Sequence, residues 1–160
     1  MTFRSHIQSA LALTLVAASI STAQAETASS SFQVGMEVTA TCSITAADMT
    51  FSGITTGTTS QKDAAADISV NCSQGAPYAI SLSDGSNFSG GRRLKSGNSF
   101  INYSLFMDVN RSSNWTTSNT LDFVGSGTTQ VHTVYGRIPS GQSVPNMGSY
   151  ADTIVATVSY

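Results

Sequence analysis

The 160-residue chain is predicted to be an all-β protein, and two features of its sequence support this. Apolar residues alternate with polar residues in short runs, which is the period of a strand with one buried face. Clusters of Gly, Ser, Asn and Asp, such as residues 84–87 and 125–127, separate the runs and favour turns. Short strands joined by turns predict a two-sheet β-sandwich of immunoglobulin type.

The alternation predicts seven strands, and helix-favouring sequence is scarce. The strands are expected at residues 32–41, 43–51, 67–71, 78–83, 101–108, 131–138 and 150–160. Only residues 61–66, which contain three consecutive alanines, are expected to form a single helical turn.

The first 25 residues have the features of a secretory signal peptide. Arg4 and His6 precede an apolar run at residues 10–18, and Ala23-Gln24-Ala25 is a small-residue cleavage site. The apolar run is too short for a membrane span, which needs about 20 residues. We therefore expect cleavage after Ala25, which removes residues 1–25.

The next segment, residues 26–41, belongs to an alternation that is too long for one strand of a sandwich. Phe32, Val34, Met36 and Val38 share one face, and the pattern continues past residue 41. About 14 residues of strand would span about 45 Å, whereas a usual strand spans about 17–20 Å. Because an unpaired apolar strand promotes aggregation, this segment is expected to fold back onto its own sheet or to enter another molecule.

The remaining residues, 42–160, fit a single domain. The two cysteines, Cys42 and Cys72, are predicted to form a disulfide because export places them in an oxidising compartment. A redox or metal role is disfavoured, because the pair lacks Cys-x-x-Cys spacing and the mature chain has a single histidine, His132. No metal and no cofactor are expected.

Other polar and aromatic residues argue against a catalytic or nucleic-acid role. The only basic cluster, Arg92, Arg93 and Lys95, is expected in a Gly-rich turn and does not form the basic stripe that a polyanion needs. His132 is expected to face solvent from a strand and has no nucleophile motif beside it. Trp115 is expected to pack against the end of the sandwich. The chain is therefore predicted not to be an enzyme and not to bind nucleic acid.

The last predicted strand runs to the end of the sequence. Ile154, Ala156, Val158 and Tyr160 share one of its faces, and no residues follow to form a closing strand. If the sandwich lacks a strand here, an open apolar groove and an unpaired sheet edge remain. A strand donated by another molecule could fill that groove, so these four residues are its predicted edge.

Two blocks of sequence resemble a known family. The first is residues 102–108, Asn-Tyr-Ser-Leu-Phe-Met-Asp, and the second is residues 133–142 with its continuation at residues 148–153. Together with the cysteine pair, these blocks closely resemble the spore coat protein U domain family, which includes the pilins of archaic chaperone-usher pili. Phe106 departs from the Tyr that family members often carry.

The resemblance implies an incomplete immunoglobulin-like sandwich that is completed by a donor strand from a neighbouring subunit. A periplasmic chaperone would hold the subunit open, and an outer-membrane usher would polymerise it by donor-strand exchange. Phe32, Val34, Met36 and Val38 would be the donor side chains, and the predicted groove edge would also contact the chaperone. The chain would pass through the periplasm and build an extracellular pilus for surface attachment and biofilm formation.

Within such a pilus the subunit is expected to belong to the shaft, with an adaptor position as the alternative, and a tip adhesin would be a further partner. Two other functions remain open. The chain could be a monomeric secreted binding module that folds its first strand back and uses loops 86–91 and 111–120. It could also be a coat protein that forms no ordered fibre. The overlong first strand favours the pilus subunit, because a donor and a groove on different surfaces form a contact that propagates.

Overall fold

The computed structural model describes residues 24–144 and 146–160. The predicted signal peptide therefore lies outside the described residues, apart from Gln24 and Ala25. The chain divides into two units, residues 1–36 and residues 37–160. No helix in the described part of the chain is long and apolar enough to cross a membrane.

The second unit is built from strands and turns, as the alternation predicts, and its described residues contain no helix. The ten strands are β1 (Cys42–Ala46), β2 (Gly57–Thr58), β3 (Lys62–Cys72), β4 (Pro77–Leu82), β5 (Arg92–Ser96), β6 (Ser99–Phe106), β7 (Leu121–Val124), β8 (Thr129–Ile138), β9 (Ser143–Val144) and β10 (Ala156–Ser159). Strands β3, β4, β6 and β8 confirm four of the predicted strands, with β3 longer than expected.

Other predicted element positions are wrong. The strand expected at residues 43–51 ends at Ala46, and the one expected at residues 150–160 is reduced to β10. Residues 61–66 form no helical turn, because residues 62–66 belong to β3. Pairing with β8 along this whole stretch overrides the helix propensity of the alanines.

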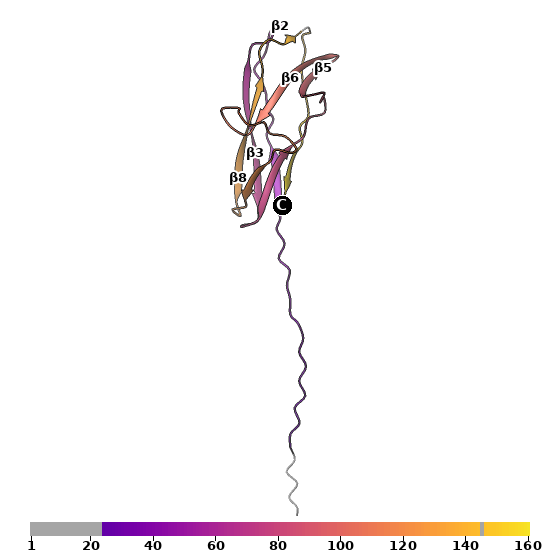
Figure 1. Cartoon of the computed structure of the whole chain (residues 1–160), viewed down its shortest axis with the longest axis vertical. Helices are drawn as coiled ribbons and strands as arrows, with labels where there is room; N and C mark the ends of the chain where they lie inside the picture. Colours follow the sequence, from indigo (N-terminus) through magenta and orange to yellow (C-terminus); the bar gives the residue numbers. More distant parts are fainter. Residues whose placement is uncertain (1–23, 145) are drawn as a thin grey trace, which may run out of the picture. The chain divides into compact units, whose positions relative to one another are not determined.

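Two antiparallel sheets form the layers of the sandwich (Figure 1). One sheet has the strand order β1-β3-β8-β6-β5, and the other has the order β10-β4-β7. The short pair β2-β9 lies at one end of the body, and the C-terminus lies at the other (Figure 1). Strands β1 and β10 are each outermost in their sheet, so each has a single partner strand among the described residues.

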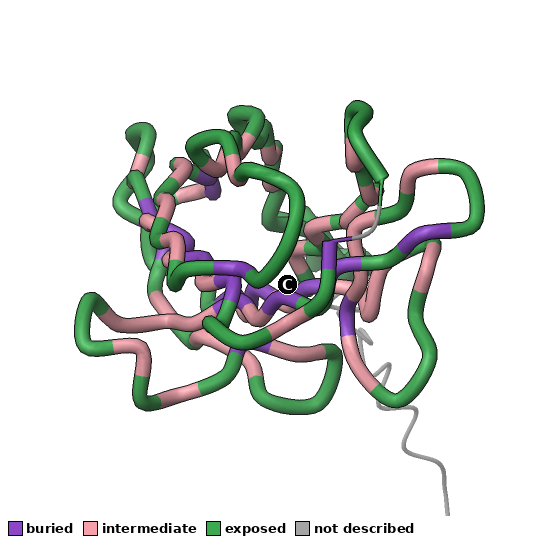
Figure 2. The backbone as a smooth tube through the Cα atoms, turned by 90° about the horizontal axis from the view of Figure 1, so that it is seen from above, coloured by how far each residue is buried: buried purple, intermediate pink, exposed green. Residues whose placement is uncertain are grey.

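Side chains from both sheets meet in one core. Along the backbone, buried positions alternate with less buried ones, and the outer loops are exposed (Figure 2). Val70, Ile80 and Ile138 come from three different strands and are fully buried. Trp115 is also fully buried, and its indole N–H donates to the carbonyl of Ile80 at 2.9 Å. Trp115 is therefore packed, as predicted, but it lies in the core of the sandwich.

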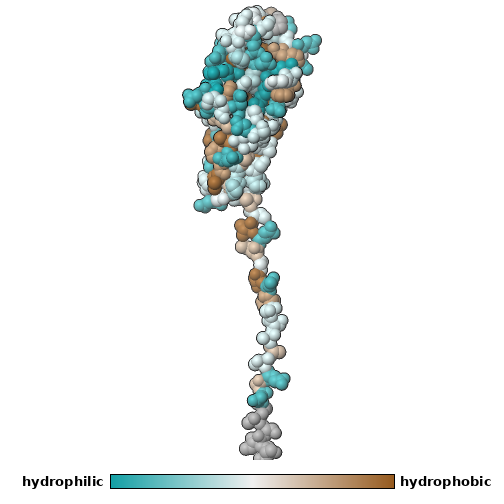
Figure 3. Space-filling view, viewed as in Figure 1, coloured by the Kyte–Doolittle hydropathy of each residue, from teal (hydrophilic) through white to brown (hydrophobic). Residues whose placement is uncertain are grey.

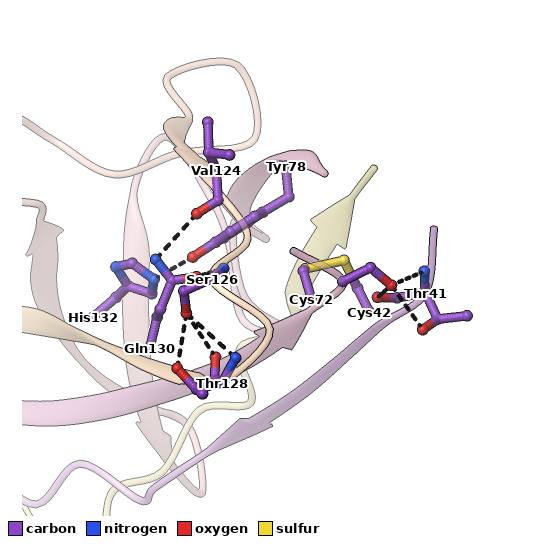
Figure 4. Close-up of a disulfide and its surroundings, with 10 residues drawn as sticks. Thr41, Cys42, Cys72, Tyr78, Val124, Ser126, Thr128, Gln130 and His132 are labelled. Carbon is purple, nitrogen blue, oxygen red and sulfur yellow. Dashed lines mark hydrogen bonds between the residues drawn. A yellow bond between two sulfur atoms is a disulfide. The ribbon is translucent and has the colours of Figure 1, made fainter. Parts of the chain in front are cut away.

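Cys42 and Cys72 form the predicted disulfide, which joins the first residue of β1 to the last residue of β3 (Figure 4). The two cysteines are also paired in the β1–β3 register. Next to them, the backbone N–H of Thr41 donates to the Ser73 hydroxyl at 3.0 Å, and the Ser73 N–H donates to the Thr41 carbonyl at 2.9 Å. The edge strand β1 is therefore fastened where it begins.

The basic cluster lies on strand β5 and not in the Gly-rich turn that the sequence suggested. Arg92 is 6% exposed, and its guanidinium donates to the carbonyls of Ser83 and Trp115. Burial lowers the pKa of Arg92. Arg93 lies over an aromatic ring at the surface, and Lys95 is exposed. Because Arg92 has a structural role, the cluster offers fewer exposed cations than the sequence suggested.

His132 faces the core, so the prediction that it faces solvent is wrong. It is 8% exposed, and its Nε2 lies 2.8 Å from the hydroxyl of Tyr78 (Figure 4). The ring of Phe123 stacks on it with the centroids 4.0 Å apart. The inward face of β8 consists of the even-numbered residues, which include His132. Burial lowers the pKa of His132.

This lowered pKa predicts that the body loses stability as the pH falls below about 6.5, the usual pKa of an unfolded-state histidine. Below that pH the unfolded chain binds a proton that the folded chain resists, so the free energy of unfolding decreases until the folded pKa is passed. Urea melts of the mature chain between pH 7.5 and 5 would measure this. His132→Gln should flatten the slope, and an unchanged slope would contradict the prediction.

Candidate functional site

An open groove runs across the body between two stretches of chain. Its two adjoining cavities have volumes of about 500 and 630 Å³. Residues 46–56 form one side, called here the first lip, and residues 146–156 contribute the other side, called the second lip. Met49, Phe51 and Leu94 line both cavities, so the two form one continuous groove.

The floor of the groove is apolar and comes from both sheets. It consists of Ile68, Leu82, Leu94, Ile101, Leu105, Val134 and Ile138, with Tyr103 among them. Four small side chains, Ala46, Ala47, Ala66 and Ala156, line the cavity next to β10. Their size leaves room there for a large apolar side chain from outside the body.

The first lip is held by side chains more than by its backbone. The backbone groups of residues 48–56 form no hydrogen bonds with other described residues. Met49 and Phe51 pack inward over Gly136 of β8, where a Cβ would meet the Met49 sulfur and lie 2.8 Å from Phe51 Cζ. The Phe51 ring also contacts the ring of Tyr103 edge-on. A glycine at position 136 is therefore required for the lip to lie against the sheet.

We expect Gly136→Ala to displace Met49 and Phe51 and to lower the free energy of unfolding by about 1–3 kcal/mol, because overpacking forces neighbours to shift. Chemical denaturation of the purified mature chain measures this. Gly53→Ala is the matched control on the same lip, since its added Cβ would meet nothing within 4 Å. Equal effects of the two substitutions would contradict the prediction.

The second lip is fixed by Asp152. Its carboxylate accepts a hydrogen bond from the Tyr103 hydroxyl at 2.8 Å and one from the Asn87 backbone N–H at 3.1 Å. Burial, together with the bond to Asp152, raises the pKa of Tyr103, so the phenol remains a donor at neutral pH. Further along the lip, Ser83 and Val155 exchange backbone and side-chain hydrogen bonds. This side of the groove is therefore preformed.

Both sides of the groove end in strands with a free edge. Strand β1 leads into the first lip, and β10 continues the second lip, and each pairs with only one described strand. Free backbone groups beside an apolar groove are the arrangement that accepts an added β-strand. The site can therefore bind an extended, alternating apolar segment.

The structure leaves the predicted donor side chains exposed. Phe32, Val34, Met36 and Val38 are each more than 80% exposed, and residues 24–41 belong to no strand. Hydrophobic and hydrophilic side chains follow one another along this part of the chain (Figure 3). The strand expected at residues 32–41 has no partner strand among the described residues.

The predicted groove-edge residues have different positions. Ile154 and Ala156 line the groove. Val158 packs against the core and is not part of the groove lining, and Tyr160 is 63% exposed. The first lip was not predicted, although the apolar Met49, Phe51 and Ile54 in an otherwise polar stretch were a signal for it.

Comparison with known proteins agrees with this architecture. Residues 28–157 match the Spore Coat Protein U domain. The chain is 41% identical to Protein U of Myxococcus xanthus over 73 residues. This matched stretch covers 43% of this chain and 40% of Protein U. The chain therefore spans well under half of the length of this curated relative.

A solved structure shares the fold. It is the CsuC–CsuE chaperone–tip adhesion subunit pre-assembly complex from the archaic chaperone-usher Csu pili of Acinetobacter baumannii. The TM-score is 0.57 at 23% identity, and the match covers 77% of this chain and 40% of that one. Because the domain match extends over most of the sequence, the chain belongs to the Spore Coat Protein U domain family.

Proposed function

We propose that this chain is a structural subunit of a chaperone-usher pilus and that it polymerises by donor-strand exchange. One observation carries the proposal: the same chain has an exposed, alternating apolar segment and an open groove with an apolar floor, and the two sides of this groove lead into β1 and β10, which each have a single partner strand. Because the segment and the groove are different surfaces, the contact between copies is heterologous and does not close. Copies therefore add head to tail into a filament.

The donor side chains match the floor of the groove in polarity. Four side chains at alternate positions, Phe32 to Val38, extend over about 20 Å of strand. Burying them in the groove contributes roughly 6–12 kcal/mol gross, and ordering the segment offsets part of this. Hydrogen bonds to the free edges add to the contact. Slow escape of a strand buried along its length would make the fibre durable.

The groove needs a cover before assembly, because an apolar groove flanked by free strand edges promotes aggregation. We infer that a periplasmic chaperone provides this cover and that an outer-membrane usher exchanges it for the donor segment of the next subunit. The fold shared with a pilus subunit in a pre-assembly complex with a chaperone supports the chaperone step. The product would be an extracellular pilus for surface attachment and biofilm formation, with this subunit in the shaft and a tip adhesin at its end.

The test compares the mature chain with a chain that lacks residues 26–38, each produced with its cognate chaperone and usher. Electron microscopy and size-exclusion chromatography measure fibre formation. We expect fibres only when the segment is present. A chain of full length in which the four donor side chains are replaced by serine controls for segment length, and it should form no fibres. Equally stable monomers from all three chains would instead indicate a binding module or a coat protein.

A further inference from the structure

Strand β1 is the place where two connections of a fibre would meet, if the proposed donor-strand exchange is correct. It begins at Cys42, only four residues after the last donor side chain, Val38. It ends at Ala46, which lines the groove for the neighbour's donor. Tension along a fibre would therefore enter each body through β1, and the same strand would help to hold the next subunit.

Without the disulfide, hydrogen bonds would hold strand β1 only weakly. It pairs only with β3, from Cys42↔Cys72 to Ala46↔Ile68, and the hydrogen bonds between Thr41 and Ser73 add a single further connection on the pulled side. After it, the Ala47 N–H donates to the Asp67 carbonyl at 2.9 Å, and residues 48–56 add no further backbone hydrogen bonds with described residues. A short edge strand with one ladder can separate pair by pair from the end that is pulled.

Strand β3, in contrast, is anchored on both sides. Its other neighbour is β8, with which it pairs from Lys62 to Asn71. Cys72 itself is 1% exposed, and its carbonyl accepts the N–H of Gly127 at 3.1 Å. Gly125 lies so close that an added Cβ there would be 2.9 Å from the Cys72 Cβ. Cys72 is therefore a fixed point in the body.

We propose that the Cys42–Cys72 disulfide is a tension clamp, which transfers force from the donor segment directly to β3. Its position at the first pair of the ladder is what this role requires. A covalent link at the Ala46 end would leave the pulled pairs free to separate. Without the clamp, β1 leaves the sheet under tension, and the groove loses one edge, so both connections of the subunit fail together.

The test holds assembled fibres of the mature chain at constant force and measures the time to rupture before and after reduction in place. A dithiol reduces the bond to two thiols and is itself oxidised to a cyclic disulfide, and alkylation followed by mass spectrometry verifies complete reduction. We expect fibre lifetimes to shorten about tenfold or more. The ratio of the two lifetimes should increase with force, because the bond lies on the path of the force.

Two variants make the result specific. Fibres of the Cys42→Ala/Cys72→Ala chain should rupture as early as reduced fibres and should not respond to the dithiol. Ile80 lies in β4, in the core and in the other sheet. Ile80→Val should shorten fibre lifetimes by a factor that does not change with force. If the ratio of lifetimes before and after reduction does not change with force, or if reduction does not shorten the lifetimes, the tension-clamp proposal is wrong. The proposed pilus function would not be affected by either result. Absence of fibres from the unmodified chain would instead count against the proposed function.

Discussion

Replacing Ala66 by leucine is expected to block uptake of a donor strand while leaving the body folded. Ala66 lines the cavity beside β10, and its small side chain leaves space above Ile68 and Val134. The longer leucine side chain would occupy that space. Forcing a donor side chain into a filled site costs about 1–3 kcal/mol, which weakens donor binding by roughly 5- to 150-fold.

Ala65→Leu is the matched control for this substitution. Ala65 is the preceding residue of β3, and it is exposed on the opposite face of the sheet. The measurement is binding of a labelled peptide of residues 26–41 to a mature chain whose own donor segment is disabled by substitution. Ala66→Leu should lose binding with an unchanged or slightly raised melting temperature, and Ala65→Leu should bind normally. If both variants bind equally well, the groove is not the acceptor.

The fold class was predictable because alternation is a local property of the sequence. The strands that were not predicted, such as β5 and β7, have local sequences that do not indicate a strand. Strand β5 begins with Arg92 and Arg93, and it is stable because the Arg92 guanidinium finds carbonyl acceptors on distant segments. Strand β7 has four residues, too few for a clear period. Strand β10 is shorter than its alternation, because Ile154 and its neighbours on the second lip follow the groove and do not pair in a regular ladder.

One side of the groove was partly predictable, and the other side was not. Ile154 and Ala156, which line the groove, belong to an apolar alternation that can be recognised in one sequence. The donor role of residues 32–38 stays a prediction. The first lip depends on contacts between distant residues, because Phe51 lies inward only where Gly136 of β8 has no side chain. The inward position of His132 likewise follows from the register of β8, which its polarity did not indicate.

Replacing Val34 by aspartate is expected to abolish fibre formation, which is the largest effect of any single substitution considered for the donor segment. Val34 is central among the four predicted donor side chains and is 86% exposed in the free chain. In the free subunit the aspartate remains in water, so the body should fold and bind its chaperone as before. In the fibre the carboxylate would be buried in the groove, where the cavity beside β10 has no Lys or Arg in its lining to pair with it.

Gln33→Asp adds the same charge one residue earlier, where the side chain of an inserted strand points away from the groove. We expect Gln33→Asp fibres at normal yield and no Val34→Asp fibres, with equal melting temperatures for the two monomers. Mixing Val34→Asp subunits with unmodified ones tests which function is lost. A Val34→Asp subunit has an intact groove, so it should accept a donor segment from an unmodified subunit. It should then end the fibre, because its own segment cannot enter another groove. A small proportion of Val34→Asp protein should therefore shorten wild-type fibres. An Ala66→Leu subunit has the opposite defect, because it can donate its segment but its filled groove cannot accept one. Fibres of unchanged length in the mixed assembly would show that residues 32–38 are not the strand that joins the subunits.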